Sequence, residues 1–81
     1  MKIYVLAFGV AKEIFQSDSI SAELNDASTL LDLRSWIEKK YPALKKLGSY
    51  MIAVNKEYIR DDSIKIFSSD EIAIIPPVSG G

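Results

Sequence analysis

The sequence predicts an α+β fold in which one main helix packs on one face of a mixed β-sheet. A chain of 81 residues has room for one domain, which we place over residues 1–81. The chain contains no cysteine, so its 48% hydrophobic content has to form the core without disulfides. Several short β-type segments surround a single segment with helical periodicity, and this pattern favours one helix against one sheet.

The first 24 residues predict a β-hairpin. Residues 2–8 (KIYVLAF) are β-branched and aromatic, which is typical of a strand. Both alternating sets of this strand are apolar, so the strand is either central or covered by a partner on its second face. Residues 10–17 are expected to form a connection. Residues 19–24 alternate and predict the second strand, with Ile20, Ala22 and Leu24 on one face.

Residues 29–40 predict the main helix. Thr29 followed by Asp32 has the spacing of a capping box, with Asp in the place of Glu. Pro42 ends the helix because the residue before a proline avoids the helical region, and residues 42–48 add a short further turn. Leu30, Leu33 and Ile37 recur at helical spacing, and Leu31 and Trp36 are expected to widen this apolar stripe.

The second half of the chain predicts three more strands. Residues 51–55 and 58–60 form two of them, and residues 61–69 are irregular. Residues 71–75 (EIAII) are almost entirely apolar, which indicates a buried central strand. Pro76 and Pro77 end this strand, since proline has no N–H for the sheet. The resulting order, ββαβββ, is the β-grasp arrangement.

Composition excludes most catalytic chemistry. Without cysteine the chain has no thiolate zinc site, iron–sulfur cluster or thiol nucleophile. Without histidine it has no Ser-His relay and no usual zinc site. The adjacent carboxylates Asp61-Asp62 and Asp70-Glu71 lack the spacing of a metal-binding loop, so we expect no metal site. The chain therefore carries no conventional set of catalytic side chains.

The charge pattern limits the partners. A formal net charge of −1 gives no overall footprint for nucleic acid. The charge is nevertheless uneven, because residues 34–46 are mainly basic and residues 57–71 mainly acidic. Both segments are expected to be solvated surface, with protein docking as the alternative. The apolar N-terminal segment is too short to cross a membrane and lacks a leader cleavage site, which indicates a cytoplasmic protein without a membrane partner.

The last ten residues, IAIIPPVSGG, are the most unusual feature. No side chain after Glu71 carries a charge, and the sequence ends at Gly80-Gly81. The prolines favour an extended exit from the sheet, so residues 76–81 are expected to form a flexible, narrow tail led by a carboxylate. The glycines would let an enzyme approach the terminal carbonyl closely. Adenylation of that carboxylate by ATP, followed by attack of a sulfur nucleophile, would give a thiocarboxylate. The alternative is a frayed terminus without function.

These motifs resemble the MoaD branch of the MoaD/ThiS ubiquitin-like sulfur carriers, the small subunits of molybdopterin synthase. The resemblance covers essentially the whole chain: the VLAF strand with the KEIF segment, the helix start TLLDL, and above all the ending DEIAIIPPVSGG. Ser68-Ser69 stand where the family usually has Asp-Gly. Ile74 and Ile75 stand where the family has aromatic residues, which affects a packing surface but not the tail.

The resemblance implies a role for the C-terminus. Gly81, presented by Gly80, would be adenylated by an E1-like, MoeB-type enzyme that uses Mg-ATP, and then converted to a thiocarboxylate. The chain itself would bind no cofactor. The tail would enter the large subunit, MoaE, where its sulfur attacks cyclic pyranopterin monophosphate (precursor Z) to build the dithiolene of molybdopterin. The chain would thus be the sulfur-donating subunit of a sulfurtransferase, in a heterotetramer with a central large-subunit dimer.

The resemblance also assigns a partner surface. It places a docking face at Phe8, Tyr58 and Ile75, with core packing as an equal alternative, and lets the tail residues contact the partner. Those tail residues are Pro76, Pro77, Val78 and Ser79. Two other functions stay open: a sulfur carrier for thiamin thiazole, cysteine or tRNA thiolation, and a ubiquitin-like protein modifier. Thiamin carriers are generally shorter and lack Pro-Pro at this site, which argues against that pathway.

Overall fold

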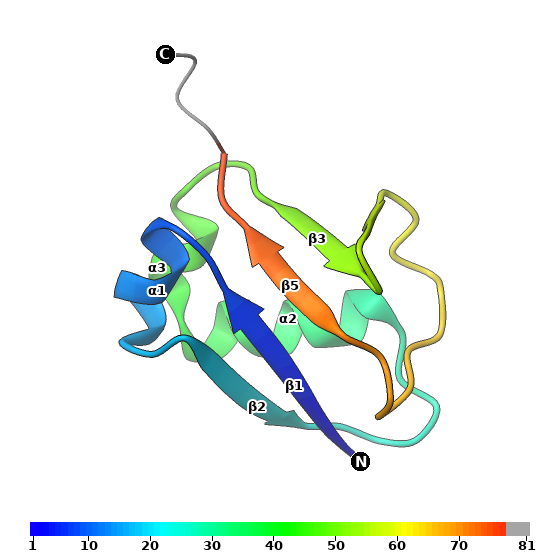
Figure 1. The fold of residues 1–81 in the computed structure, drawn as a ribbon. Coiled ribbons are helices and arrows are strands. Elements are labelled where there is room, and N and C mark those ends of the chain that lie inside the picture. Colours follow the sequence, from blue (N-terminus) through cyan, green and yellow to red (C-terminus); the bar gives the residue numbers. More distant parts are fainter. Residues whose placement is uncertain (78–81) are drawn as a thin grey trace.

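The computed structural model describes residues 1–77. Its strands form one five-stranded mixed sheet (Figure 1). The strand order is β2-β1-β5-β3-β4, and all neighbours are antiparallel except β1 and β5, which are parallel. The strands are β1 (Lys2–Ala7), β2 (Ser19–Glu23), β3 (Met51–Val54), β4 (Glu57–Ile59) and β5 (Ile72–Ile75). The predicted hairpin and the central position of the last strand are confirmed.

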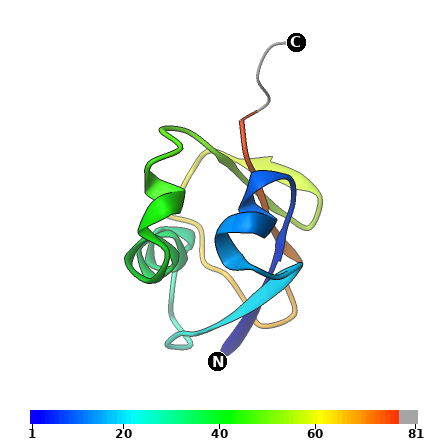
Figure 2. The same cartoon turned by 90° about the vertical axis from the view of Figure 1, so that its left-hand side faces the viewer.

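The helices cover one face of this sheet, as the view in Figure 2 shows. They are α1 (Val10–Phe15), α2 (Leu30–Lys40) and α3 (Pro42–Lys45). Beneath them lies a core of fully buried aliphatic side chains, in which Ile3 and Val5 of β1 and Ile74 of β5 meet Leu33 and Ile37 of α2. Burial of these side chains supplies most of the free energy that stabilises a chain of this size.

The start of α2 has the predicted capping box. The Asp32 backbone N–H donates to Thr29 Oγ1 at 3.4 Å, and the Thr29 backbone N–H donates to Asp32 Oδ2 at 2.9 Å. These bonds satisfy N–H groups that the first turn of a helix leaves without partners. The helix ends at Lys40 before Tyr41 and Pro42, as predicted, and α3 follows at once.

The prediction of a connection over residues 10–17 is wrong, because residues 10–15 form α1. Gly9 enters this helix with φ 55° and ψ −133°, and no side chain caps it. Six residues are too few for a visible helical period. The helix is held instead by contacts from elsewhere in the chain, since Phe15 is buried and its ring centroid lies 4.7 Å from that of Tyr41.

Leu31 does not widen the apolar stripe of α2. Its side chain is 52% exposed, whereas Trp36 is partly buried against the core as expected. Leu31 follows Leu30 by one residue, and a rotation of about 100° per residue carries it off the buried face. The β3–β4 turn also lies one residue earlier than predicted, at Asn55 and Lys56, which have φ of 53° and 71°. Two positive φ values in a two-residue loop match the twist of a β-hairpin.

A polar network joins α2 to the segments around it. Arg34 Nη1 lies 3.1 Å from Asp62 Oδ2, and the Arg34 guanidinium lies 5.5 Å from the ring centroid of Tyr50. Tyr50 Oη donates to Glu38 Oε2 at 2.6 Å. Burial, and then this hydrogen bond to a carboxylate, raise the pKa of Tyr50 well above its ordinary value. The hydroxyl is therefore protonated near neutral pH, where it can donate to Glu38.

Candidate functional site

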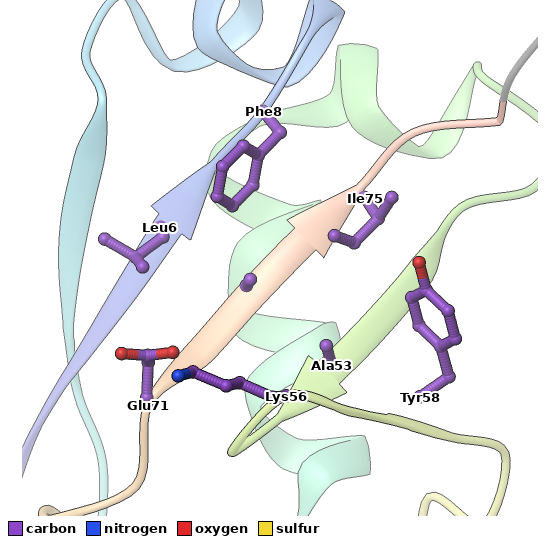
Figure 3. A pocket seen from close by; sticks show the side chains of 8 residues that line it. Leu6, Phe8, Ala53, Lys56, Tyr58, Glu71 and Ile75 are labelled. Carbon is purple, nitrogen blue, oxygen red and sulfur yellow. The ribbon is translucent and has the colours of Figure 1, made fainter.

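The open face of the sheet carries an apolar groove of about 300 Å³ (Figure 3). Its floor is low because Ala53 of β3 and Ala73 of β5 have small side chains. Its sides are larger apolar residues, and Lys56 and Glu71 lie at one end. The larger lining residues are Leu6 and Phe8 on the β1 side, Ile75 on β5 and Tyr58 on β4.

The period of the strands explains how these side chains reach one face. Ile74 is fully buried under the helices, so its neighbour Ile75 points to the other face. Leu6 pairs with Ala73 across the parallel β1–β5 ladder, and Ala53 pairs with Ala73 across the antiparallel β3–β5 ladder. Tyr58 of β4 pairs in turn with Ala53. Cross-strand partners share a face, so four strands contribute to one surface.

The charged end of the groove is held by Asn55. Its Nδ2 donates to Asp70 Oδ1 at 3.0 Å, and its Oδ1 accepts from the Glu71 backbone N–H at 2.9 Å. The Asn55 backbone N–H also donates to the Glu71 carbonyl at 2.7 Å. These bonds fix the β3–β4 turn, and therefore Lys56, to the start of β5 next to Glu71.

The opposite end of the groove is where the chain leaves the sheet. Pro76 lies against Gly9, because a Cβ added to Gly9 would lie 3.1 Å from Pro76 Cγ. With φ 55°, Gly9 also adopts a conformation that other residues rarely take. Pro76 is partly buried and Pro77 is exposed. The groove and the start of the predicted tail are thus adjacent.

The structure brings together the three residues predicted for a docking face. Phe8 is 46% exposed and Tyr58 is 60% exposed, so the alternative of core packing is wrong for both. Ile75 is partly buried and lies between them in the groove. Pro76 and Pro77 follow directly. Val78, Ser79, Gly80 and Gly81 lie outside the described residues.

Sequence reasoning missed five lining residues. Leu6 belonged to the second apolar set of the first strand, so its alternation was an available signal. The two alanines had no signal of their own, because an alanine fits either face of a sheet. Their position depends on pairing between strands that are far apart in the sequence. The five residues are Leu6, Ala53, Lys56, Glu71 and Ala73.

Within residues 1–77 no group of three or more His, Cys, Asp or Glu side chains could hold a metal ion. In the same part of the chain no helix has the length and apolar character needed to cross a membrane. The feature that residues 1–77 do present is the apolar groove, which adjoins the start of the tail.

Comparison with known proteins identifies the family. Residues 5–81 match the ThiS family. The chain is 49% identical to the molybdopterin synthase sulfur carrier subunit of Dictyostelium discoideum, over 95% of this chain and 93% of that protein. Among solved structures, it is similar to the complex of subunits 1 and 2 of the molybdopterin-converting factor from Helicobacter pylori, with a TM-score of 0.71, 30% identity and all of both chains covered.

A third similarity is to the small archaeal modifier protein 1 from Methanosarcina acetivorans. The TM-score is 0.80 at 28% identity, over 99% of this chain and 96% of that one. The match to these proteins confirms the predicted β-grasp fold. The family match spans nearly the whole sequence, and the Dictyostelium protein, which is of nearly the same length, is identical to this chain at about half of the aligned positions. The chain therefore belongs to the ThiS/MoaD family.

Proposed function

We propose that this chain is the sulfur carrier subunit of molybdopterin synthase. The Dictyostelium relative that bears this name is 49% identical to it over nearly the full length of both proteins. The observation that carries the proposal is that the sequence PPVSGG follows the central strand β5, and that its described start, Pro76 and Pro77, leaves the sheet at one end of the apolar groove. A groove that binds a partner would place the tail that follows it at that partner's active site.

In the proposed reaction the chain supplies its C-terminus and no side chain. A carboxylate oxygen of Gly81 attacks the α-phosphorus of ATP, and pyrophosphate leaves. A persulfide sulfur then attacks the acyl carbon and displaces AMP. A thiol cleaves the resulting sulfur–sulfur bond, which leaves a thiocarboxylate on Gly81. The sulfur of this group attacks a side-chain carbon of cyclic pyranopterin monophosphate, and a carbon–oxygen bond at that carbon breaks. Water then hydrolyses the acyl–sulfur bond, which returns the carboxylate and leaves the sulfur on the pterin. Two such transfers complete the dithiolene.

The proposed partner in the second half of this cycle is the large subunit of molybdopterin synthase. In the similar Helicobacter pylori structure, subunit 1 is in a complex with subunit 2 of the same factor. We assign the contact in this protein to the groove, with Phe8, Tyr58 and Ile75 as apolar anchors and Pro76 and Pro77 leading the tail away. Large apolar side chains that are exposed in a free subunit are the residues that interfaces typically bury.

The proposal extends to the activating enzyme and the assembly. An E1-like, MoeB-type enzyme with Mg-ATP would form the acyl-adenylate, so this chain needs no cofactor of its own. The final complex would be a heterotetramer around a large-subunit dimer, in the cytoplasm. No side chain between residues 72 and 81 is charged, which suits insertion of the tail into a narrow, desolvated site.

A second function has specific support. The similarity to a small archaeal modifier protein, at 28% identity, favours a ubiquitin-like modifier that uses the same activation of Gly81. The two functions differ in the nucleophile that takes the activated C-terminus: a sulfur atom for the carrier, a lysine amine for the modifier. A carrier for another thiolation pathway shares the first of these chemistries.

The test is the intact mass of the chain after incubation with the activating enzyme, Mg-ATP and a sulfur source. We expect a gain equal to one oxygen replaced by sulfur, localised to Gly81. The thiocarboxylated chain, mixed with the large subunit and the pterin precursor, should then form molybdopterin. Conjugates to lysines of other proteins would instead favour the modifier function. An unchanged mass, with the enzyme active on a control carrier, would contradict both.

Deleting Gly81, or adding one residue after it, provides the matched control. Either change should abolish sulfur transfer, because the reacting carboxylate would no longer be in place. Folding should be unaffected, because the core residues that the structure describes all lie between Ile3 and Ile74. Sulfur transfer by either variant would contradict the mechanism.

A further inference from the structure

Gly9 and Pro76 meet at the point where the chain leaves the sheet. Along the parallel β1–β5 ladder, Ala7 pairs with Ile74. The same register, continued by two residues, places Gly9 beside Pro76. Figure 1 shows the end of β1, where the chain passes into α1, next to the end of β5. The contact between the two residues therefore follows from the register of the central strands.

The contact leaves no room for a side chain at position 9. A Cβ on Gly9 would lie 3.1 Å from Pro76 Cγ and 3.9 Å from Pro76 Cδ. Carbon atoms of packed side chains are separated by about 3.5–4.0 Å, so even a methyl group would overlap the ring. A proline side chain is closed onto its own backbone and cannot rotate away. A side chain at position 9 would therefore displace Pro76 or Gly9 itself.

The two prolines carry the direction of the chain at Pro76 outward. Their rings fix φ near about −65°, and a following proline confines ψ of Ile75 and Pro76 to the extended region. Among the described residues, no backbone hydrogen bond outside the helices and strands includes Pro76 or Pro77. Packing of the Pro76 ring, including its contact with Gly9, therefore sets the direction in which this segment leaves the sheet.

This direction matters because the reacting group of the proposed function lies further along the chain. Gly81 is the fifth residue after Pro76, and a fully extended chain of five residues spans about 17 Å. A partner that binds the groove and receives Gly81 at a fixed site needs the groove and the tail in one relative orientation. A misplacement of about 1 Å at a reacting group can lower its rate about a hundredfold.

We propose that Gly9 is a positioning residue for sulfur transfer. Its lack of a side chain lets Pro76 pack against the junction of β1 and α1, and this contact aims the tail relative to the apolar groove. The inference rests on the proposed sulfur-carrier function and adds a residue to it. Gly9 acts through Pro76 and not on the reacting atoms. The alternative is a role confined to the turn into α1, which Gly9 enters with φ 55°.

The experiment measures sulfur transfer in a single turnover. The full chain is prepared with a C-terminal thiocarboxylate, so no activating enzyme is needed, and is mixed with saturating large subunit and the pterin precursor. Gly9→Ala should slow molybdopterin formation about tenfold, because the thiocarboxylate reaches the site misaligned. Its affinity for the large subunit, measured by titration calorimetry, should be unchanged, because the side chains of the groove are the same. A loss of rate without a loss of affinity indicates a defect in positioning.

Gly48→Ala is the matched control. Gly48 also has a positive φ, of 81°, but nothing lies within 4 Å of a Cβ added there. Both substitutions strain a backbone conformation that favours glycine, so both should lower the melting temperature by about 5 °C. Only Gly9→Ala should slow sulfur transfer. Circular dichroism verifies that both variants are folded at the temperature of the assay.

A second background separates the contact from the backbone strain. Pro76→Ala removes Cγ and Cδ of the ring, the two atoms that an added Cβ would meet. This substitution should itself slow transfer, because the tail loses a fixed φ. Gly9→Ala in the Pro76→Ala background should then cause no further loss of rate, although it still lowers the melting temperature. Two substitutions that act at one contact are coupled in this way.

Three results would overturn the inference. Equal rates for wild type and Gly9→Ala would confine Gly9 to the turn and leave the sulfur-carrier function intact. Equal slowing by Gly9→Ala and Gly48→Ala would show an effect of stability alone. Additive losses for Gly9→Ala and Pro76→Ala would show that Gly9 does not act through Pro76. If the wild-type thiocarboxylate forms no molybdopterin at all, the proposed function fails as well.

Discussion

The two faces of the sheet differ in what covers them. On one face, the helices bury Ile3, Val5 and Ile74 completely. On the other face, side chains of similar apolar character stay exposed: Tyr4 at 59%, Phe8 at 46% and Tyr58 at 60%. These exposed side chains add no burial free energy to the stability of the isolated chain. Each would contribute about 1.5–3 kcal/mol only if a second surface covered it. One face is closed by the helices, and the other is the face that the proposed function assigns to association.

Adjacent residues of β5 separate these two roles. Ile74 and Ile75 have identical side chains and neighbouring positions on the central strand, yet Ile74 is fully buried and Ile75 lines the groove. Their contrast therefore isolates the effect of the face from the effects of residue type and strand position.

The largest expected effect is on the covered face. Ile74→Ala should lower the free energy of unfolding by about 2–5 kcal/mol, since it removes buried methyl groups and leaves a cavity. This is a large share of the roughly 5–15 kcal/mol typical of a domain. Urea denaturation followed by circular dichroism measures it. Ile75→Ala is the control and should cost about 1 kcal/mol or less. Equal losses for the two variants would contradict the division between the faces.

The next effect is on the open face. Ile75→Lys should weaken binding of the large subunit by about 30-fold, or about 2 kcal/mol, because the charge would be desolvated in the interface. Stability of the free chain should change little, since a lysine at this partly buried position on the open face can extend its ammonium group into water. Titration calorimetry with the large subunit measures the affinity.

Leu31→Lys is the matched control for this variant. It makes the same kind of change at an apolar side chain that is 52% exposed, but on α2, away from the groove. It should leave the affinity for the large subunit unchanged. Unfolding of the free Ile75→Lys variant would instead place Ile75 in the core of the isolated chain.

The sequence predicts the covered face better than the open one, for a physical reason. Burial of Ile3, Val5 and Leu33 leaves a periodic pattern in a local window, and Thr29 with Asp32 marks the start of α2. The groove depends on pairing between β1, β3 and β5, which lie far apart in the sequence, so only Phe8, Tyr58 and Ile75 were found, and those through a family resemblance.

Two errors have different origins. The helix α1 is held by contacts of Phe15 with Tyr41 and by burial of Ala11, not by a local signal, so its six residues were expected to form a connection. Tertiary packing decided this case, and a sequence window does not contain it. The exposed position of Leu31 follows instead from the helical period, which turns Leu31 away from the stripe of Leu30, Leu33 and Ile37, so the local sequence did contain that signal.

The smallest predicted effect tests whether stability and association are independent. Thr29 Oγ1 accepts a hydrogen bond from the Asp32 backbone N–H on the helical side of the sheet, away from the groove. Thr29→Ala should therefore lower the free energy of unfolding by about 1 kcal/mol and leave the affinity for the large subunit unchanged. Thr29→Ser keeps the hydroxyl and should retain most of the stability. Thermal unfolding and titration calorimetry on the same samples measure both quantities. A loss of affinity that follows the loss of stability across these variants would mean that α2 orders the open face, and the two faces would then act as one unit.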